Sequence, residues 1–194
     1  MAVVAGATLG RDATLVLTVF ATLVSLLGDP SLLLALVTGL TVLDRERWVP
    51  VLAVTLGGYA LTLGVETALA VPARTATAPP VAAESLPSLL RPLYEREAAS
   101  DGYALPSGHV VAATVVWLQL AWPGAVGTRP GKDRLRAALA ARRARIGLAA
   151  TVVGLVAWSR VFLGAHVAVD VVAGVALGAS YLLVVAAVWR RYRR

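Results

Sequence analysis

Apolar residues form long runs along this chain, and most charged residues gather in the segments between the runs. A run of about 20 apolar residues is the length that a helix needs to cross the hydrocarbon core of a bilayer. The pattern therefore predicts an all-α, polytopic membrane helical bundle of about six transmembrane helices, forming a single domain over residues 1–194. The expected spans are residues 13–28, 30–43, 49–71, 107–122, 146–158 and 166–188.

The triplet Gly28, Asp29 and Pro30 separates the first two runs and is a strong turn signal. A run of about 15 residues rises only about 22 Å as a helix, which is less than a hydrocarbon core of about 30 Å. Two short helices are expected here. The alternative is one long span broken at the proline, which would move only the N-terminus to the other side of the membrane.

Two longer polar segments define the sides of the membrane. Residues 72–105 are polar and proline-rich and predict an outer loop, with a short helix near 88–99. Residues 123–145 are rich in arginine and predict a cytoplasmic loop, whose 135–144 part is expected to be a basic helix on the membrane surface. Most of the 18 Lys and Arg residues then lie on one side, as cytoplasmic loops require. The protein is expected in the cell membrane as a multi-pass protein.

Composition narrows the classes of function. The chain is 58% hydrophobic, against about 45–50% in soluble domains, and its net charge is +7. Because the basic residues lie in loops between spans, they indicate contact with anionic lipid, and no nucleic-acid partner is expected. The chain has no cysteine and two histidines, so we expect no metal or other cofactor.

The candidate chemistry lies in the stretch 159–170, where Arg160, His166 and Asp170 interrupt a sequence that is otherwise apolar. Ionisable groups are costly in such a setting, so they usually face a cavity and have a function. His166 and Asp170 are four residues apart, a spacing that places both on one face of a helix. His166 can act as a nucleophile, Asp170 can orient its ring, and Arg160 can bind phosphate.

A second motif, Pro106, Ser107, Gly108 and His109, opens the fourth apolar run with the only other histidine. Backbone N–H groups of Ser107 and Gly108 at a helix start can point at an anion. His109 can protonate a leaving oxygen. Both motifs are expected at the same outer membrane face, which predicts an extracytoplasmic phosphoryl-transfer site.

These two motifs resemble the second and third signatures of the type 2 phosphatidic acid phosphatase family, which includes undecaprenyl-diphosphate phosphatases and is related to vanadium haloperoxidases. The resemblance implies six spans with the site on the outer face and no metal requirement. It also implies a phosphohistidine intermediate on His166 supported by Asp170, His109 as general acid, and Ser107, Gly108 and Arg160 as phosphate ligands.

The first family signature, a lysine followed after six residues by Arg-Pro, is altered here. One placement ends at Arg91-Pro92 and leaves Glu84 at the lysine position. The other begins at Glu66 and ends at Arg74, which is shifted by one residue. Arg74 and Arg91 are both candidates for the second phosphate-binding cation, and neither placement offers the lysine.

The expected function is a membrane-bound, metal-independent phosphatase that hydrolyses a lipid phosphate or a polyprenyl diphosphate. Two alternatives stay open: a lipid phosphotransferase that uses the same site, and a catalytically weakened protein that binds a phosphate head group. The sequence does not indicate the oligomeric state.

Overall fold

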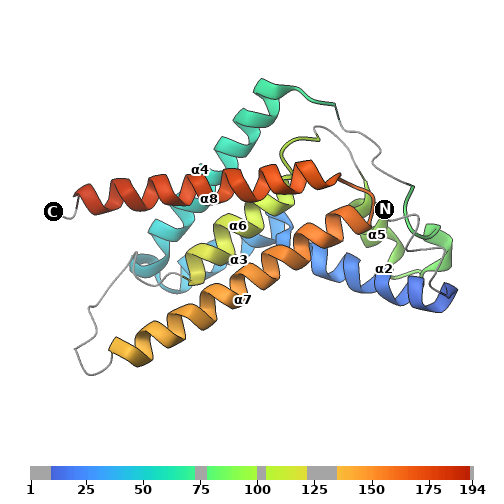
Figure 1. Cartoon of the computed structure of the whole chain (residues 1–194), viewed down its shortest axis with the longest axis horizontal. Coiled ribbons are helices and arrows are strands. Elements are labelled where there is room, and N and C mark those ends of the chain that lie inside the picture. The colour runs from blue at the N-terminus through green and yellow to red at the C-terminus, as the bar shows by residue number, and fades with distance from the viewer. Residues whose placement is uncertain (1–9, 73–77, 100–103, 122–134, 193–194) are drawn as a thin grey trace.

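The computed structural model describes residues 10–72, 78–99, 104–121 and 135–192, and most of these residues are helical (Figure 1). Side chains are described from residue 141 onwards in the last of these ranges. Helices are α2 (Arg11–Ser25), α3 (Pro30–Leu43), α4 (Arg45–Leu69), α5 (Arg91–Ala98), α6 (Gly108–Ala121), α7 (Leu135–Phe162) and α8 (Ala168–Tyr192), with short 3-10 turns η1 (Leu26–Gly28) and η2 (Ala83–Ser85).

The predicted all-α membrane architecture is confirmed. Four helical segments within the described residues are long and apolar enough to cross a bilayer: Arg11–Gly28, Arg45–Leu69, Ala141–Phe162 and Ala168–Tyr192. Two shorter apolar helices, Pro30–Leu43 and Gly108–Ala121, occupy the positions of the other two predicted spans. The short helix expected in the 72–105 loop is α5.

The break between α2 and α3 is built from the predicted turn triplet. The Asp29 carboxylate accepts a hydrogen bond of 2.8 Å from the Leu32 N–H, and Pro30 occupies the first turn, so both residues favour a helix start. A Cβ on Gly28 would lie 2.5 Å from Val156 Cγ1 and 2.9 Å from the His109 carbonyl oxygen. Only glycine therefore allows η1 to approach α6 and α7 this closely.

Helices α2 and α3 follow one another instead of folding back as a hairpin. Leu15 and Val19 of α2 pack in the cluster that contains Phe162 at the end of α7, whereas Gly28 lies against Val156, earlier in α7. Helix α2 therefore runs antiparallel to α7, and α3 continues away from the end of α7 (Figure 1). The helices on either side of the predicted break are both present, and whether they cross the membrane as two spans or as one broken span stays a prediction.

The expectation of a separate surface helix over residues 135–144 was wrong. Helix α7 is continuous from Leu135 to Phe162 and contains the predicted 146–158 span. The segment before Ile146 consists mainly of Ala, Arg and Leu, which are strong helix formers, and it contains no proline. Nothing in its sequence interrupts the helix, so the basic segment and the span form one element.

Helix α6 lies at the centre of the bundle, where it packs against α4, α7 and α8. A Cβ on Gly174 would lie 3.0 Å from the Ser107 carbonyl oxygen, and one on Gly178 would lie 2.8 Å from Thr114 Cβ. These two glycines let α8 approach α6 closely. The close packing brings the start of α6 to the turn between α7 and α8.

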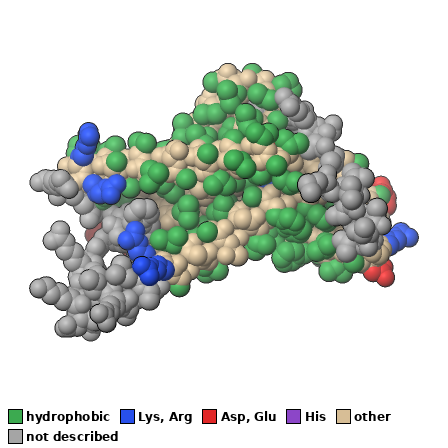
Figure 2. Space-filling view, in the orientation of Figure 1, with side chains coloured by type: hydrophobic (Ala, Val, Ile, Leu, Met, Phe, Trp, Pro, Cys, Tyr) green, Lys and Arg blue, Asp and Glu red, His purple; other side chains and the backbone are tan. Residues whose placement is uncertain are grey.

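Basic side chains gather at the end of the bundle that is opposite the turn between α7 and α8. Figure 2 shows Lys and Arg at the end where α7 begins and α8 ends, and Arg190 and Arg191 lie in the last turn of α8. Lys and Arg mark the cytoplasmic side of a membrane protein. The turn between α7 and α8 lies at the other end of the molecule (Figure 1).

Candidate functional site

The turn between α7 and α8 places His166 at the end of the bundle. Gly164 has φ 78°, a left-handed conformation that glycine adopts without steric cost, and the His166 N–H donates to the Arg160 carbonyl oxygen at 3.2 Å. Helix α8 begins only at Ala168. His166 therefore precedes the helix, and the expectation that it shares a helix face with Asp170 was wrong, because Gly164 ends the helical path before the histidine.

The hydrogen bonding of His166 fixes which ring nitrogen is free. Its Nδ1 lies 3.2 Å from the Ala104 carbonyl oxygen and 3.5 Å from Asp170 Oδ2. A carbonyl oxygen only accepts hydrogen bonds, so Nδ1 carries the proton, and Nε2 of the neutral ring carries the lone pair. Nε2 makes no hydrogen bond to any residue of the described ranges.

Burial is the main cause of a lowered pKa at His166. The pKa falls to about 4 because burial and the nearby Arg160 charge disfavour the imidazolium, and these effects outweigh the opposing effect of the Asp170 carboxylate. The ring is therefore neutral at physiological pH. A neutral ring with a free Nε2 lone pair has the chemical form that a nucleophile needs.

Asp170 joins the two sequence motifs. Its Oδ2 accepts from the Val167 N–H at 3.1 Å, and its carbonyl oxygen accepts from the Ser107 N–H at 3.1 Å. The Ser107 N–H is therefore not available for an anion, contrary to expectation. The Ser107 hydroxyl is fully buried and has no hydrogen-bond partner among the described residues, so it is the free donor of this residue.

Arg160, near the end of α7, extends its side chain across the site to α5 and α2. Its Nη1 donates to the Glu97 carbonyl oxygen at 2.6 Å, to Ser25 Oγ at 3.0 Å and to Glu97 Oε2 at 3.3 Å. The side chain is almost fully buried, and its Nε has no partner in the part of the chain that the structure describes. Buried donors without partners are rare, and here two of them, on Arg160 and Ser107, flank the same motifs.

His109 occupies the first turn of α6. Its Nε2 lies 3.1 Å from Glu97 Oε2 and 4.0 Å from Asp29 Oδ2. Because a carboxylate accepts, Nε2 carries a proton and donates it to Glu97. Nδ1 has no hydrogen-bond partner within the described ranges, which leaves this nitrogen for a substrate.

Sequence reasoning missed Glu97, which lies in α5. Its side chain is 1% exposed and accepts hydrogen bonds from Ser25, Arg96, His109 and Arg160. Burial alone would raise the pKa of this carboxyl, but the bonds from His109, Ser25 and Arg96 outweigh that effect and lower it to about 2. Glu97 is therefore ionised and connects α5 to α2, α6 and α7.

The structure distinguishes the two placements of the altered first signature. Glu66 Oε1 lies 3.5 Å from the position that a Cβ on Gly108 would occupy, so the Glu66 placement adjoins the second motif. Arg91 instead donates to the carbonyl oxygens of Leu86 and Glu84, both at 2.9 Å, within its own loop. Arg74 lies outside the described residues.

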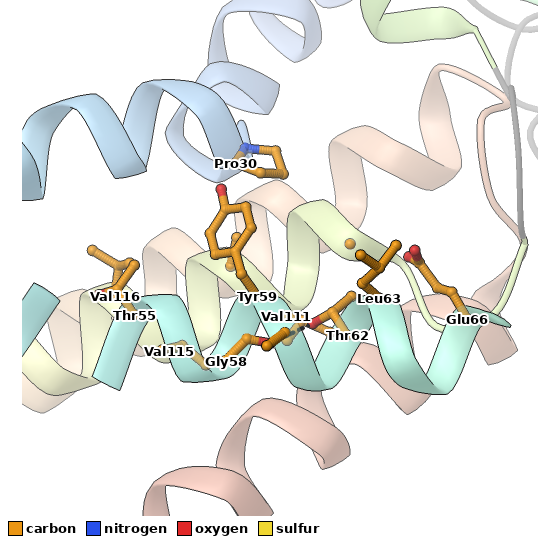
Figure 3. A pocket seen from close by; sticks show the side chains of 13 residues that line it. Pro30, Thr55, Gly58, Tyr59, Thr62, Leu63, Glu66, Val111, Val115 and Val116 are labelled. Carbon is orange, nitrogen blue, oxygen red and sulfur yellow. Dashed lines mark hydrogen bonds between the residues drawn. The ribbon is translucent and has the colours of Figure 1, made fainter. Parts of the chain in front are cut away.

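A pocket of about 290 Å³ extends from this point between α4 and α6. Glu66 and Gly108 line one end and Thr55 lines the other, with mainly apolar side chains such as Leu63 and Val111 between them. In Figure 3, Glu66 lies at one end of the row of α4 side chains, beside the start of α6. An apolar pocket that begins next to the motif residues suits an aliphatic chain.

A group of three possible metal ligands, Asp29, Glu97 and His109, also lies within the described ranges, with ligand atoms within 4.8 Å of one another. Arg96 pairs with Asp29 at 2.7 Å and with Glu97 at 2.9 Å, and Arg160 also contacts Glu97. Two guanidinium groups already neutralise these carboxylates and would repel a cation. The donor set therefore fits a metal ion poorly.

The arrangement thus brings together five predicted residues from the two motifs: Ser107, His109, Arg160, His166 and Asp170. Gly108 begins α6 beside them. The site has a neutral histidine with a free nitrogen, a second histidine held by a carboxylate, and two buried donors without partners. Groups of this kind can bind an oxyanion, attack it and protonate a leaving group.

Comparison with known proteins identifies the family. The fold resembles that of the first transmembrane PAP2-type phosphatidylglycerolphosphate phosphatase from Bacillus subtilis, with a TM-score of 0.66 and 22% sequence identity over 93% of this chain and 82% of that one. No curated protein sequence matches the chain. Residues 47–194 match the sequence profile of the PAP2 superfamily, and the chain therefore belongs to that superfamily.

Proposed function

We propose that this protein is a membrane lipid phosphatase that acts through a phosphohistidine on His166. Membership of the PAP2 superfamily supports phosphatase activity on a lipid phosphate. The single observation that carries the mechanism is the state of His166: Nδ1 is bound to the Ala104 carbonyl, the pKa is lowered to about 4, and Nε2 is free.

The reaction follows from the free groups of the site. Nε2 of His166 attacks phosphorus while the bond to the leaving oxygen breaks, and protonated His109 gives its Nδ1 proton to that oxygen. With that proton, the lipid alcohol leaves from a lipid phosphate, and the lipid monophosphate leaves from a lipid diphosphate. Water then attacks the phosphohistidine, His109 takes a proton from the water, the nitrogen–phosphorus bond breaks, and phosphate leaves.

The phosphate ligands in this proposal are the Arg160 guanidinium, the Ser107 hydroxyl and the N–H groups at the start of α6. The orphaned Nε of Arg160 and Oγ of Ser107 support it, because an anion would supply the partners that these buried donors lack. Such donors stabilise charge that develops on the phosphoryl oxygens. No step requires a metal ion.

The substrate is a lipid phosphate or diphosphate whose chain enters the pocket between α4 and α6. Apolar lining and direct continuity with Gly108 support this placement. The basic end of the bundle supports an extracytoplasmic site in the cell membrane, because it lies opposite the motifs. The resemblance to a phosphatidylglycerolphosphate phosphatase makes that lipid the first substrate to test.

The test measures phosphate release by the detergent-purified protein with a chelator present. Phosphatidylglycerol phosphate, phosphatidic acid and undecaprenyl diphosphate are each offered to the wild type, to His166→Ala and to Val169→Ala. Val169 is a matched control because it lies in the first turn of α8 and its side chain is 62% exposed. We expect phosphate release that is lost only in His166→Ala, and release by that variant at the wild-type rate would contradict the phosphohistidine mechanism.

A second candidate, a protein that binds a phosphate head group without turnover, is favoured by one observation. Glu66 places a carboxylate beside Gly108, where the family signature has lysine, and an ionised carboxylate repels phosphate. If no lipid is hydrolysed by the folded wild type, Glu66→Lys is the variant to assay. Activity gained by this variant would show that the wild type is a catalytically weakened protein that binds a phosphate head group.

A further inference from the structure

The buried carboxylate of Glu97 has no part in the two motifs, yet it contacts the side chains of two residues that do. It lies 3.1 Å from His109 Nε2 and 3.3 Å from Arg160 Nη1. Ser25 Oγ, from outside the region that matches the family profile, donates to the same oxygen at 2.6 Å. One carboxylate oxygen therefore accepts from α2, α6 and α7 together.

The second carboxylate oxygen is fixed as well. Arg96 donates to Glu97 Oε1 through Nε at 3.2 Å and through Nη2 at 2.9 Å, and the same Nη2 reaches Asp29. Every direction around the Glu97 carboxylate is thus occupied by a donor. The side chain cannot rotate without breaking several charge-assisted hydrogen bonds, so its position is rigid.

We infer that Glu97 is the positioning residue of the general acid: it holds His109 by Nε2 so that Nδ1 faces the leaving oxygen, and it fixes Arg160 beside it. This inference rests on the proposed function. The ring of His109 has two nitrogens, and the carboxylate determines which of them donates to the protein and which to the substrate.

The charges around His109 agree with this role. Glu97 from α5 and Asp29 from the start of α3 face its Nε2, and Arg160 of α7 contacts the same Glu97 oxygen as His109. The carboxylates stabilise the imidazolium, whereas the guanidinium opposes it. Without the Glu97 charge, only the more distant Asp29, 4.0 Å from Nε2, would oppose Arg160, and His109 would lose the hydrogen bond that orients its ring and would hold its acidic proton less well.

A comparison of leaving groups separates this role from a merely structural one. An alkyl phosphate needs a proton on its leaving oxygen, whereas 4-nitrophenyl phosphate has a stable leaving group and does not. Glu97→Gln, which preserves the shape of the side chain, is expected to lower kcat on octyl phosphate roughly a hundredfold and on 4-nitrophenyl phosphate less than about tenfold. His109→Ala should show the same difference, and the double variant should lose little more.

Glu95→Gln is the matched control, since Glu95 lies two residues away in α5 and its side chain is exposed. It is expected to behave like the wild type on both substrates. Equal losses by Glu97→Gln on both substrates, with the fold retained, would make Glu97 a structural residue only. Wild-type rates for Glu97→Gln on both substrates would equally overturn the inference.

A measurement without activity keeps this inference separate from the proposed function. The chain has only two histidines, so a sample labelled with ¹⁵N in histidine gives assignable ring signals. Wild-type protein is expected to show a protonated Nε2 on His109 that changes in Glu97→Gln but not in Glu95→Gln. An unchanged His109 spectrum in Glu97→Gln would contradict the inference even if no substrate were found.

Discussion

Lowering the pH into the range where an ordinary histidine becomes charged is expected to leave the His166 ring neutral. The pKa of His166 is lowered to about 4 from the ordinary 6.5, first by burial and then by the charge of Arg160. At a pH of about 5.5, a histidine with the ordinary pKa is about 90% protonated, whereas one with a pKa of 4 is only about 3% protonated. The nucleophile therefore stays in its reactive form in mildly acidic conditions.

The assay is a pH titration of histidine ¹⁵N signals in detergent, between pH values of about 5 and 8, using a purification tag without histidine. His109→Gln assigns the remaining signal to His166 in a second sample. A neutral ring gives two well-separated nitrogen signals, and we expect these for His166 throughout, with the proton on Nδ1. An imidazolium spectrum for His166 at a pH of about 6 would refute the reasoning.

The same shift has a consequence for stability. The pKa of His166 is lower in the folded protein than in the unfolded chain, so between pH 6.5 and about 4 the unfolded chain binds more protons. Stability is therefore expected to fall as the pH drops through this window and to be unaffected by this group above it. A thermal melting series with His166→Gln as the comparison would measure the difference.

Three substitutions test other parts of the account. Ser107→Ala removes a buried hydroxyl without a partner, so we expect lower activity together with equal or slightly higher thermal stability; a large loss of stability would contradict this. Gly178→Ala forces a Cβ to within 2.8 Å of Thr114 and should cost about 1–3 kcal/mol, measured by thermal unfolding, whereas Gly154→Ala, where the space is open, should not. Arg160→Lys keeps the charge but loses Nε, so phosphate release should fall at least about tenfold; wild-type activity would show that Nε binds no phosphate.

The parts of this protein that the sequence predicted are those that depend on periodicity and on residue type. Apolar runs identified the helices, and counting the spans and the basic loops between them predicted that Arg160, His166 and Asp170 would lie at the same membrane face as Ser107 and His109. Those predictions rest on free-energy costs that depend on neighbouring residues in the sequence, such as the cost of placing an ionisable side chain in an apolar run. They needed no knowledge of how the helices pack.

Contacts that depend on packing were not predictable in this way. The partner of His166 Nδ1 is the carbonyl oxygen of Ala104, a backbone atom that carries no signal in the sequence. Glu97 is one of several acidic residues in a polar loop, and only the fold shows that it, and not Glu84 or Glu95, is buried among cations. The path of α2 likewise depends on Gly28 fitting against α7, which no hydrophobic pattern shows.

The most direct test of the central claim is to trap the phosphoenzyme. Wild-type protein is mixed rapidly with a phosphatidylglycerol phosphate labelled in its terminal phosphate, quenched in alkali, which preserves phosphohistidine, and analysed by peptide mass spectrometry. We expect one phosphate on His166, present in Val169→Ala and missing in His166→Ala. Turnover of the lipid with no label on His166, or label on His109 instead, would contradict it.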